Sequence, residues 1–227
     1  MIKLEKQISN WLSDYLKNNN LDTFVIGISG GIDSAVVSTL CAITGIKTYT
    51  VIMPIHQKEE ETKRGQEHCE WLKKKYPNVE SIKVDLTSTF DHFRSIFPNK
   101  VDNKLALANS RARIRMTSLY LIAGNSNGIV VGTGNKIEDF GVGFFTKYGD
   151  GGVDISPIAD LMKSEVFNLG RDLGIVDSIM NAKPTDGLWE DDRTDEDQLG
   201  LSYDELEWAM KFNGDVTKLN LEDQKKI

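Results

Sequence analysis

The sequence has few of the features that mark several classes of protein. Only two of its 227 residues are cysteines, and Cys41 and Cys69 lie far apart in segments expected to be helical. They form neither a disulfide framework nor a metal-ligand pattern, which favours reduced, partly buried thiols in a cytoplasmic protein. No apolar run is long enough to cross a membrane. The first residues do not follow the pattern of a secretory signal, and neither repeats nor low-complexity tracts occur.

Positive charge is also in short supply. The formal net charge is −7 and the isoelectric point is about 5.1, a balance that argues against general nucleic-acid binding. The composition, 40% hydrophobic and 27% charged, is otherwise ordinary for a globular protein with one sizeable core. We therefore expect a single domain over residues 1–227.

Apolar segments alternate with amphipathic ones along the chain. The apolar segments predict four strands, at residues 24–28, 48–53, 80–85 and 128–133. The amphipathic segments predict helices near residues 4–16, 35–40, 59–75, 90–93, 105–123 and 163–173. This alternation predicts an α/β fold, a doubly wound parallel sheet with helices on both faces. Ligands of such sheets bind at the carboxyl ends of the strands, so the loops after the first and fourth strands are expected to be neighbours.

A turn of small residues, the glycine turn (residues 29–34), joins the first predicted strand to a helix. It reads Ser-Gly-Gly-Ile-Asp-Ser, and such a turn lets the backbone and the first helical amides approach a phosphate. Its lack of lysine and its glycine spacing exclude a P-loop and a dinucleotide fingerprint. Asp33 would repel a phosphate, so we predict a magnesium ion between Asp33 and a polyphosphate. The alternative is that Asp33 or Ser34 caps the helix.

The helix predicted over residues 105–123 carries three arginines. Arg111 and Arg115 share one face, and a solvated basic surface is as good an interpretation of them as a ligand site. Arg113 points elsewhere, on the side of Asn109, and is the better candidate for binding an anionic or amide-bearing ligand.

Further candidates follow the fourth predicted strand. Thr133 stands between two glycines that can accept a nucleotide, and Glu138 could complete a magnesium site with Asp33; the alternative is an exposed turn. Residues 140–154 form a glycine-rich loop with aromatic side chains, which suggests closure over a flat ring, whereas a mobile surface loop is the competing interpretation. In this loop Lys147 offers a charge for a phosphate or a developing oxyanion. Two acids there offer acceptors for ribose hydroxyls or ammonium, namely Asp150 and Asp154.

Together these segments resemble one family. With Pro184-Thr185-Asp186-Gly187-Leu188-Trp189 and Thr194-Asp195-Glu196, they look like ammonia-dependent NAD synthetase of the N-type ATP pyrophosphatase superfamily. The glycine turn is shared by the superfamily, whereas the run Phe-Phe-Thr-Lys-Tyr-Gly-Asp-Gly from Phe144 is nearly private to the family. The resemblance implies an adenine nucleotide α-hydrolase-like fold. It also implies amidation of nicotinic acid adenine dinucleotide (deamido-NAD) with ammonia through an acyl-adenylate, giving NAD, AMP and pyrophosphate.

The resemblance also implies roles for individual residues. Contacts to the co-substrate ATP are assigned to Gly27, Ile28, Ser29, Gly30, Gly31, Ile32, Asp33, Ser34, Thr133, Lys163 and Thr185. Magnesium is assigned to Asp33 and Glu138, and deamido-NAD to Arg113, Lys147 and Asp154. The catalytic set is predicted to be Asp33, Lys147 and Asp150, although either Asp150 or Asp154 could handle the ammonia.

Family members are homodimers with the second substrate at the interface, so the apolar stripe of the long helix is an interface candidate. They usually continue into a C-terminal His-Lys segment that closes on the dinucleotide, and this chain has no counterpart of it. No Cys-His arrangement suggests a glutaminase, which favours free ammonia as the nitrogen source. The rivals are another enzyme of the superfamily, such as a GMP synthetase unit or a thiolation enzyme, and a sensor that binds ATP without turnover.

Overall fold

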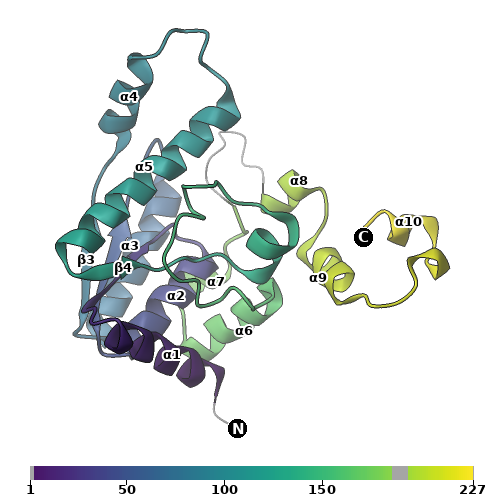
Figure 1. Ribbon diagram of the computed structural model, residues 1–227, viewed down its shortest axis with the longest axis horizontal. Helices are drawn as coiled ribbons and strands as arrows, with labels where there is room; N and C mark the ends of the chain where they lie inside the picture. The colour runs from purple at the N-terminus through teal and green to yellow at the C-terminus, as the bar shows by residue number, and fades with distance from the viewer. Residues whose placement is uncertain (1–2, 186–193, 227) are drawn as a thin grey trace.

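A four-stranded parallel sheet forms the centre of the protein. The computed structural model describes residues 3–185 and 194–226 (Figure 1). The strands are β1 (Thr23–Gly27), β2 (Lys47–Ile52), β3 (Val79–Lys83) and β4 (Gly128–Val130). Their order is β3-β2-β1-β4, and every pairing is parallel. The chain moves outward from β1 to β3 and then returns to the other side of β1, so the strand order reverses between β1 and β4. A cleft at the carboxyl ends of these two strands is where such sheets bind ligands.

Successive side chains of each strand point to opposite faces of the sheet. Phe24 and Ile26 belong to a core shared with α1 (Leu4–Asn18), α2 (Ile32–Ile43) and α6 (Lys163–Leu173). Val25 points to the other core, which α5 (Lys104–Asn125) covers. Helix α3 (Glu59–Lys75) packs on β2, β3 and α2. The doubly wound α/β fold with helices on both faces is confirmed.

The fourth strand and the segment after it differ from prediction. Strand β4 ends at Val130, and beyond it Val131 forms an isolated bridge to Ile155 and donates its amide to the Val25 carbonyl. Residues Lys136–Val142, expected to be a turn and the start of a loop, form a π-helix, η1. The wider hydrogen-bonded turn of a π-helix depends on contacts with neighbouring elements. Helices of this kind are rare and usually short.

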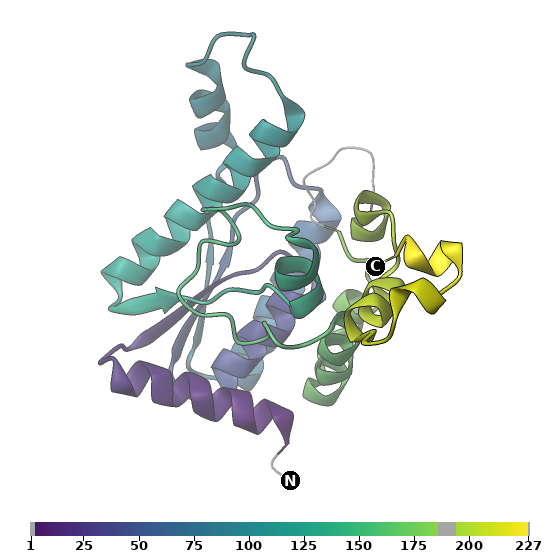
Figure 2. The ribbon, with the colours of Figure 1, turned by 45° about the vertical axis from the view of Figure 1, so that its right-hand side comes forward.

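An arm projects from the body of the protein. It consists of α4 (Thr87–Ser95), the connection after it and the first turns of α5, and both views show it standing away from the sheet (Figures 1 and 2). It exposes several large apolar side chains: Phe93, Ile96, Phe97, Val101 and Leu105. Leu105 of the apolar stripe predicted as an interface is exposed and belongs to this arm, and the role of the stripe as an interface stays a prediction. Ala108 and Ala112 of the stripe are buried within this chain, and Ala112 packs beside Gly149.

The C-terminal part consists of short helices. They are α7 (Asp177–Met180), α8 (Asp195–Leu199), α9 (Tyr203–Lys211), η2 (Val216–Lys218) and α10 (Leu221–Gln224). Helix α9 contacts η1 and α6, whereas α10 lies at the outer end of the molecule (Figure 1). Within the described residues, no helix is both long and apolar enough to cross a membrane.

Candidate active site

A cavity of about 530 Å³ lies at the carboxyl edge of the sheet, where the strand order reverses. Its walls come from the glycine turn, the start of α3, one face of α5, the residues after β4, the start of α6 and residues 182–185. All eleven residues predicted to contact ATP line this cavity, as do Glu138 and Asp150. The part of the family resemblance that falls on residues 186–193 lies outside the described residues.

The glycine turn is shaped by short contacts to itself and to α3. Gly30 has a φ of +87°, and a β-carbon there would lie 2.5 Å from the carbonyl oxygen of Glu61, so only glycine fits. The Ser29 hydroxyl accepts from the Gly31 amide at 3.1 Å, and the Ser34 hydroxyl donates to the Gly31 carbonyl at 3.0 Å. These bonds hold the turn in shape without a ligand.

Helix α2 begins at Ile32, within this turn. Its N-cap residue is Gly31, and its side-chain cap is missing, so the interpretation of Asp33 or Ser34 as a cap is wrong. The first amides of α2 therefore face the cavity edge with their positive dipole end, which is the arrangement that attracts phosphate.

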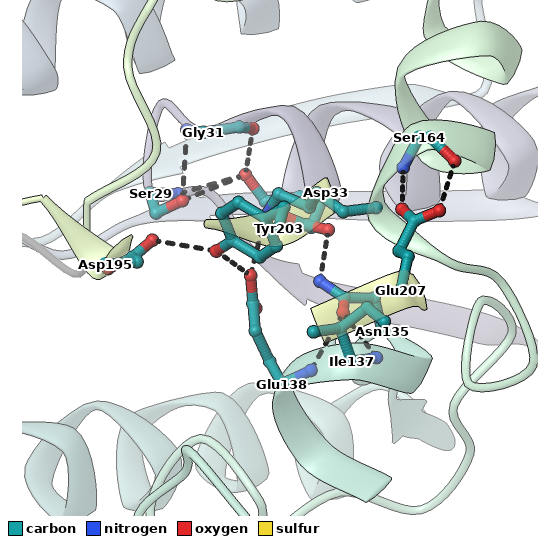
Figure 3. A network of polar contacts seen from close by, with 12 residues as sticks. Ser29, Gly31, Asp33, Asn135, Ile137, Glu138, Ser164, Asp195, Tyr203 and Glu207 are labelled. Atoms are coloured by element: carbon teal, nitrogen blue, oxygen red, sulfur yellow. Dashed lines mark hydrogen bonds and ion pairs between the residues drawn. The ribbon is translucent and has the colours of Figure 1, made fainter. Parts of the chain in front are cut away.

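Two acids and one lysine form a cluster beside the turn. The ammonium group of Lys163 donates to Asp33 Oδ2 and to Glu138 Oε1, at 2.7 Å each. The Asn135 side-chain amide donates to Asp33 Oδ1 at 3.0 Å, and the Tyr203 hydroxyl donates to Glu138 Oε1 at 2.5 Å (Figure 3). The cluster joins α2, η1, α6 and α9, elements that are far apart in the sequence.

The charges in this cluster change one another's protonation. Burial by itself disfavours charged Lys163, but the neighbouring Asp33 and Glu138 carboxylates raise its pKa above the ordinary lysine value. Burial also raises the pKa of Asp33, whereas Lys163 lowers that of Glu138 despite its burial. Burial and the adjacent carboxylates raise the pKa of Tyr203, which keeps its phenol a hydrogen-bond donor.

The donor set fits a magnesium ion. One cationic nitrogen already contacts both Asp33 and Glu138, so these carboxylates lie close enough to share a cation. Carboxylate oxygens are ligands that Mg²⁺ prefers, and it usually takes one or two of them together with substrate phosphates and water. No cluster of three acidic, histidine or cysteine side chains in residues 3–185 and 194–226 could hold a metal. A metal here would therefore depend on phosphate oxygens from a ligand.

The residue that positions Glu138 is Asn135, which was not among the residues predicted from the sequence. The Asn135 side-chain oxygen accepts from the amides of Ile137 and Glu138, at 3.0 Å each, and so caps η1. The same side chain donates to Asp33. An asparagine shortly before an acidic residue is an N-cap signal, and it was available in the sequence.

The opposite wall of the cavity is the aromatic loop (residues 143–154). Asp150 Oδ1 accepts from the Thr146 amide at 3.0 Å, and Thr146 donates its hydroxyl to Asn109 at 2.8 Å. Phe145 and Tyr148 are 44% and 65% exposed. The loop is therefore held to α5 through small polar contacts, while its large rings remain at the surface.

The three residues predicted to bind deamido-NAD do not line the cavity within this chain. Lys147 is exposed, and its carbonyl accepts from Arg113 Nε at 3.2 Å. Asp154 accepts from the Val130 amide at 2.8 Å and from the Tyr120 hydroxyl at 3.0 Å. These contacts gather them along the outer side of α5, and their role as ligand contacts stays a prediction.

Two further polar side chains line the cavity. Arg115, whose face the sequence left undecided, donates to the Met53 carbonyl at 2.9 Å and to Gln57 Oε1 at 2.7 Å. Burial lowers its pKa to about 10. Asp139 lies beside Glu138, and burial together with the charge of Asp150 raises its pKa to about 7. The sequence offered no signal for Asp139 beyond its neighbour.

Comparison with known proteins places this site in a family. The model of the NAD synthase family matches residues 4–227. The chain belongs to the NAD synthase family. A curated relative from Mesoplasma florum, an NH3-dependent NAD⁺ synthetase, is 39% identical over 96% of this chain and 88% of the relative. The enzyme class of this family is that of ligases.

Solved structures of NAD synthase relatives share the fold. The structure of NMN synthetase from Francisella tularensis is 33% identical with a TM-score of 0.88, over 98% of this chain and 89% of that one. The NH3-dependent NAD synthetase from Campylobacter jejuni, solved with a nitrate ion, is 26% identical with a TM-score of 0.76 over the same shares. The fold is the adenine nucleotide α-hydrolase-like fold of NAD synthetases.

Proposed function

We propose that the chain amidates deamido-NAD with ammonia, consuming ATP and releasing NAD, AMP and pyrophosphate. The observation that carries the proposal is the Asp33–Lys163–Glu138 cluster at the edge of the glycine turn. Two acids at an anion-binding helix end serve a reaction that needs a cation beside a polyphosphate. The match to the NAD synthase family over nearly the whole chain supports the same reaction.

The proposed reaction has two steps. The nicotinate carboxylate attacks the α-phosphorus of ATP, the bond to the bridging oxygen breaks, and pyrophosphate leaves with that electron pair. Ammonia then attacks the acyl carbon of the adenylate, loses a proton and displaces AMP. No protein nucleophile is needed, so the protein contributes mainly by holding two large anions in reacting geometry.

Residues of the cavity supply the electrostatics of the first step. Asp33 and Glu138 would hold Mg²⁺, which when bound neutralises charge that develops on pyrophosphate. The glycine turn and the start of α2 bind the phosphates, and Lys163 supplies a second positive charge beside them. Thr133 and Thr185, which both line the cavity, contribute hydroxyls.

Residues of the second wall are assigned to the acceptor and to ammonia. Lys147, with Arg113 and Asp154, contacts the acceptor, while Asp150, which faces the cavity, is placed to bind ammonium or accept its proton. Because Arg113, Lys147 and Asp154 lie outside the cavity of one chain, the acceptor site would be completed by a second copy. A homodimer formed through the exposed apolar arm is consistent with that arrangement.

A second candidate function concerns the acceptor. The solved structure of an NMN synthetase superposes with a higher TM-score than that of an NAD synthetase, 0.88 against 0.76. The corresponding reaction would amidate nicotinic acid mononucleotide with the same ATP chemistry. The mononucleotide, unlike deamido-NAD, needs no site for a second adenosine beside that of ATP.

The test is turnover with ATP, Mg²⁺ and ammonium, with deamido-NAD and nicotinic acid mononucleotide offered separately. NAD or NMN, AMP and pyrophosphate are followed together, and glutamine replaces ammonium in a parallel series. We expect equal amounts of NAD and pyrophosphate with ammonium, and a lower kcat/KM for the mononucleotide. A preference for the mononucleotide would exchange the first candidate for the second. Nucleotide binding without any AMP would identify a sensor and contradict both.

A further inference from the structure

One buried side chain touches the candidate metal site without lining the cavity. Tyr203, at the start of α9, is 8% exposed, and its hydroxyl donates to Glu138 Oε1 at 2.5 Å. It does not belong to the residues lining the cavity, although Glu138 does. Anything Tyr203 does to a ligand must therefore pass through the side chains it contacts, of which Glu138 is the nearest.

The two acids differ in how their orientation is fixed. Asp33 accepts Asn135 on Oδ1 and Lys163 on Oδ2, so each of its oxygens has a partner. Glu138 accepts both Lys163 and Tyr203 on the single oxygen Oε1. Lys163 would have to share or release the acids if a metal entered between them. Tyr203 would then still donate to Oε1 and help to fix the rotation of the Glu138 carboxylate.

Helix α9 reaches the site at two points, one turn apart. Glu207 follows Tyr203 by four residues and therefore lies on the same face. It is 7% exposed and accepts from the Ser164 amide and hydroxyl, at 2.8 Å each (Figure 3). Ser164 is the neighbour of Lys163, whose ammonium lies 5.0 Å from the centre of the Tyr203 ring. One face of α9 thus contacts both η1, which carries Glu138, and α6, which carries Lys163.

The packing beneath this face is a small separate core. Tyr203 and Leu206 pack with Ile137 of η1 and Met162 before α6. A phenylalanine would fill the same apolar site, so the hydroxyl is not required for packing. A buried hydroxyl needs a hydrogen-bond partner, and the shorter of its two contacts is to the candidate metal ligand. The Asp195 Oδ2 atom, at 3.4 Å, is more distant, and the single hydroxyl proton is directed to Glu138.

We propose that Tyr203 is a positioning residue that orients Glu138 toward the metal and couples the seating of α9 to metal binding. The proposal rests on the proposed function, because it takes Glu138 as a magnesium ligand. Partners that orient a metal ligand typically change metal affinity by about 10- to 100-fold when they are removed. The effect belongs to metal-dependent steps, whereas nucleotide binding without metal depends on the glycine turn and is unaffected.

The test replaces the hydroxyl alone, with Tyr203→Phe. Mn²⁺ binding is measured by electron paramagnetic resonance in the presence of α,β-methylene-ATP, whose bridging carbon blocks cleavage. We expect the Mn²⁺ dissociation constant to rise about tenfold or more, in line with other removed partners of metal ligands. The KM for Mg²⁺ should rise in parallel with little change in kcat. Nucleotide affinity in EDTA should equal that of the unmodified protein.

Two control variants separate orientation from packing. Tyr15→Phe removes a hydroxyl on α1, far from the site, and should change nothing. Leu206→Ala weakens the same small core without touching the hydroxyl, and should lower the melting temperature more than Tyr203→Phe while weakening Mn²⁺ binding less. If Tyr203→Phe fails to fold, Tyr203→Met, which fills the site with a flexible apolar chain, replaces it.

Different results would contradict different claims. A Mn²⁺ dissociation constant within twofold of the unmodified value, or an equal loss of nucleotide affinity with and without metal, would overturn the role of Tyr203. If the unmodified protein bound no Mn²⁺ and formed no AMP, the proposed function itself would fail. Normal turnover with unchanged metal dependence in Tyr203→Phe would leave the function standing and remove only the positioning role.

Discussion

The two walls of the cavity differ in the contacts that hold them in shape. The glycine turn is short, closed on itself by serine hydroxyls and pressed against α3 so tightly that Gly30 has no room for a side chain. The aromatic loop is longer, carries exposed rings, and binds the rest of the chain through Thr146, Asp154 and the Lys147 carbonyl. The first wall therefore already has the shape that is expected to bind phosphate. The second presents charges to the outside of the chain, where a partner can meet them.

The largest effect is expected at the first wall, from Asp33→Ala. A bound metal contributes several kcal/mol of charge stabilisation, so the rate of AMP formation should fall by about 10³-fold or more. Circular dichroism should show the same fold. Asp172→Ala, an exposed acid on α6, is the control and should retain full activity. Normal turnover in a folded Asp33→Ala protein would refute the metal assignment.

Substituting one glycine in each wall compares the two walls directly. Gly30 and Gly143 both have positive φ, +87° and +69°, but a β-carbon meets Glu61 at the first and nothing within 4 Å at the second. Gly30→Ala should lower the free energy of unfolding by at least about 2 kcal/mol, since steric overlap adds to backbone strain. Gly143→Ala should cost only about 1 kcal/mol, the strain alone. Urea denaturation measures both, and equal losses would show that the tight packing of the glycine turn is not what matters.

Arg113→Ala tests the outward-facing charges of the second wall. Loss of one charge-assisted contact to the acceptor is worth about 1.5 kcal/mol, so its KM should rise about tenfold while the KM for ATP stays constant. Arg171→Ala, on an exposed part of α6, provides the comparison. A rise in the KM for ATP instead would place Arg113 with the first wall.

The smallest effect is expected where the two walls approach each other, at Asp139. Its raised pKa, about 7, means that folding favours the protonated acid. Its stabilising contribution is therefore complete below about pH 4 and is lost as the pH rises through about 7. Asp139→Asn should thus gain stability over the unmodified protein from about pH 4 upward, levelling above pH 7 at about 1 kcal/mol after allowance for solvent screening of a partly exposed group. Chemical denaturation at several pH values measures this difference, and a constant difference would contradict the shifted pKa.

Local sequence was enough for the sheet and for the first wall. Strands β1, β2 and β3 follow apolar or alternating runs, and the glycine turn is a continuous segment whose geometry depends on its own residues. Their neighbours in space follow from parallel topology alone. This is why the glycine turn and Thr133 line one cavity, whereas Lys163 and Thr185 were assigned to ATP by the family resemblance.

The second wall and the C-terminal helices needed information from distant parts of the chain. The π-helix η1 is held by Asn135, which contacts Asp33 across 102 positions of sequence. Helical spacing placed Arg111 and Arg115 on one face, but only the segment around Met53 and Gln57 decides that Arg115 is covered. Tyr203 reaches Glu138 across 65 positions. Such contacts join residues that are far apart in the sequence, and no local sequence pattern predicts them.

Helix α5 has a mechanical consequence for the cavity. Its 22 residues form a rod about 33 Å long, with the exposed apolar arm at one end and cavity-lining residues along its middle. Ala112 and Met116 of the same rod touch Gly149 and Gly152 of the aromatic loop. Because a helix bends little over this length, a displacement at the arm end of α5 would also move the residues that lie beside the loop. The exposed arm and the wall formed by the aromatic loop are thus joined through one helix.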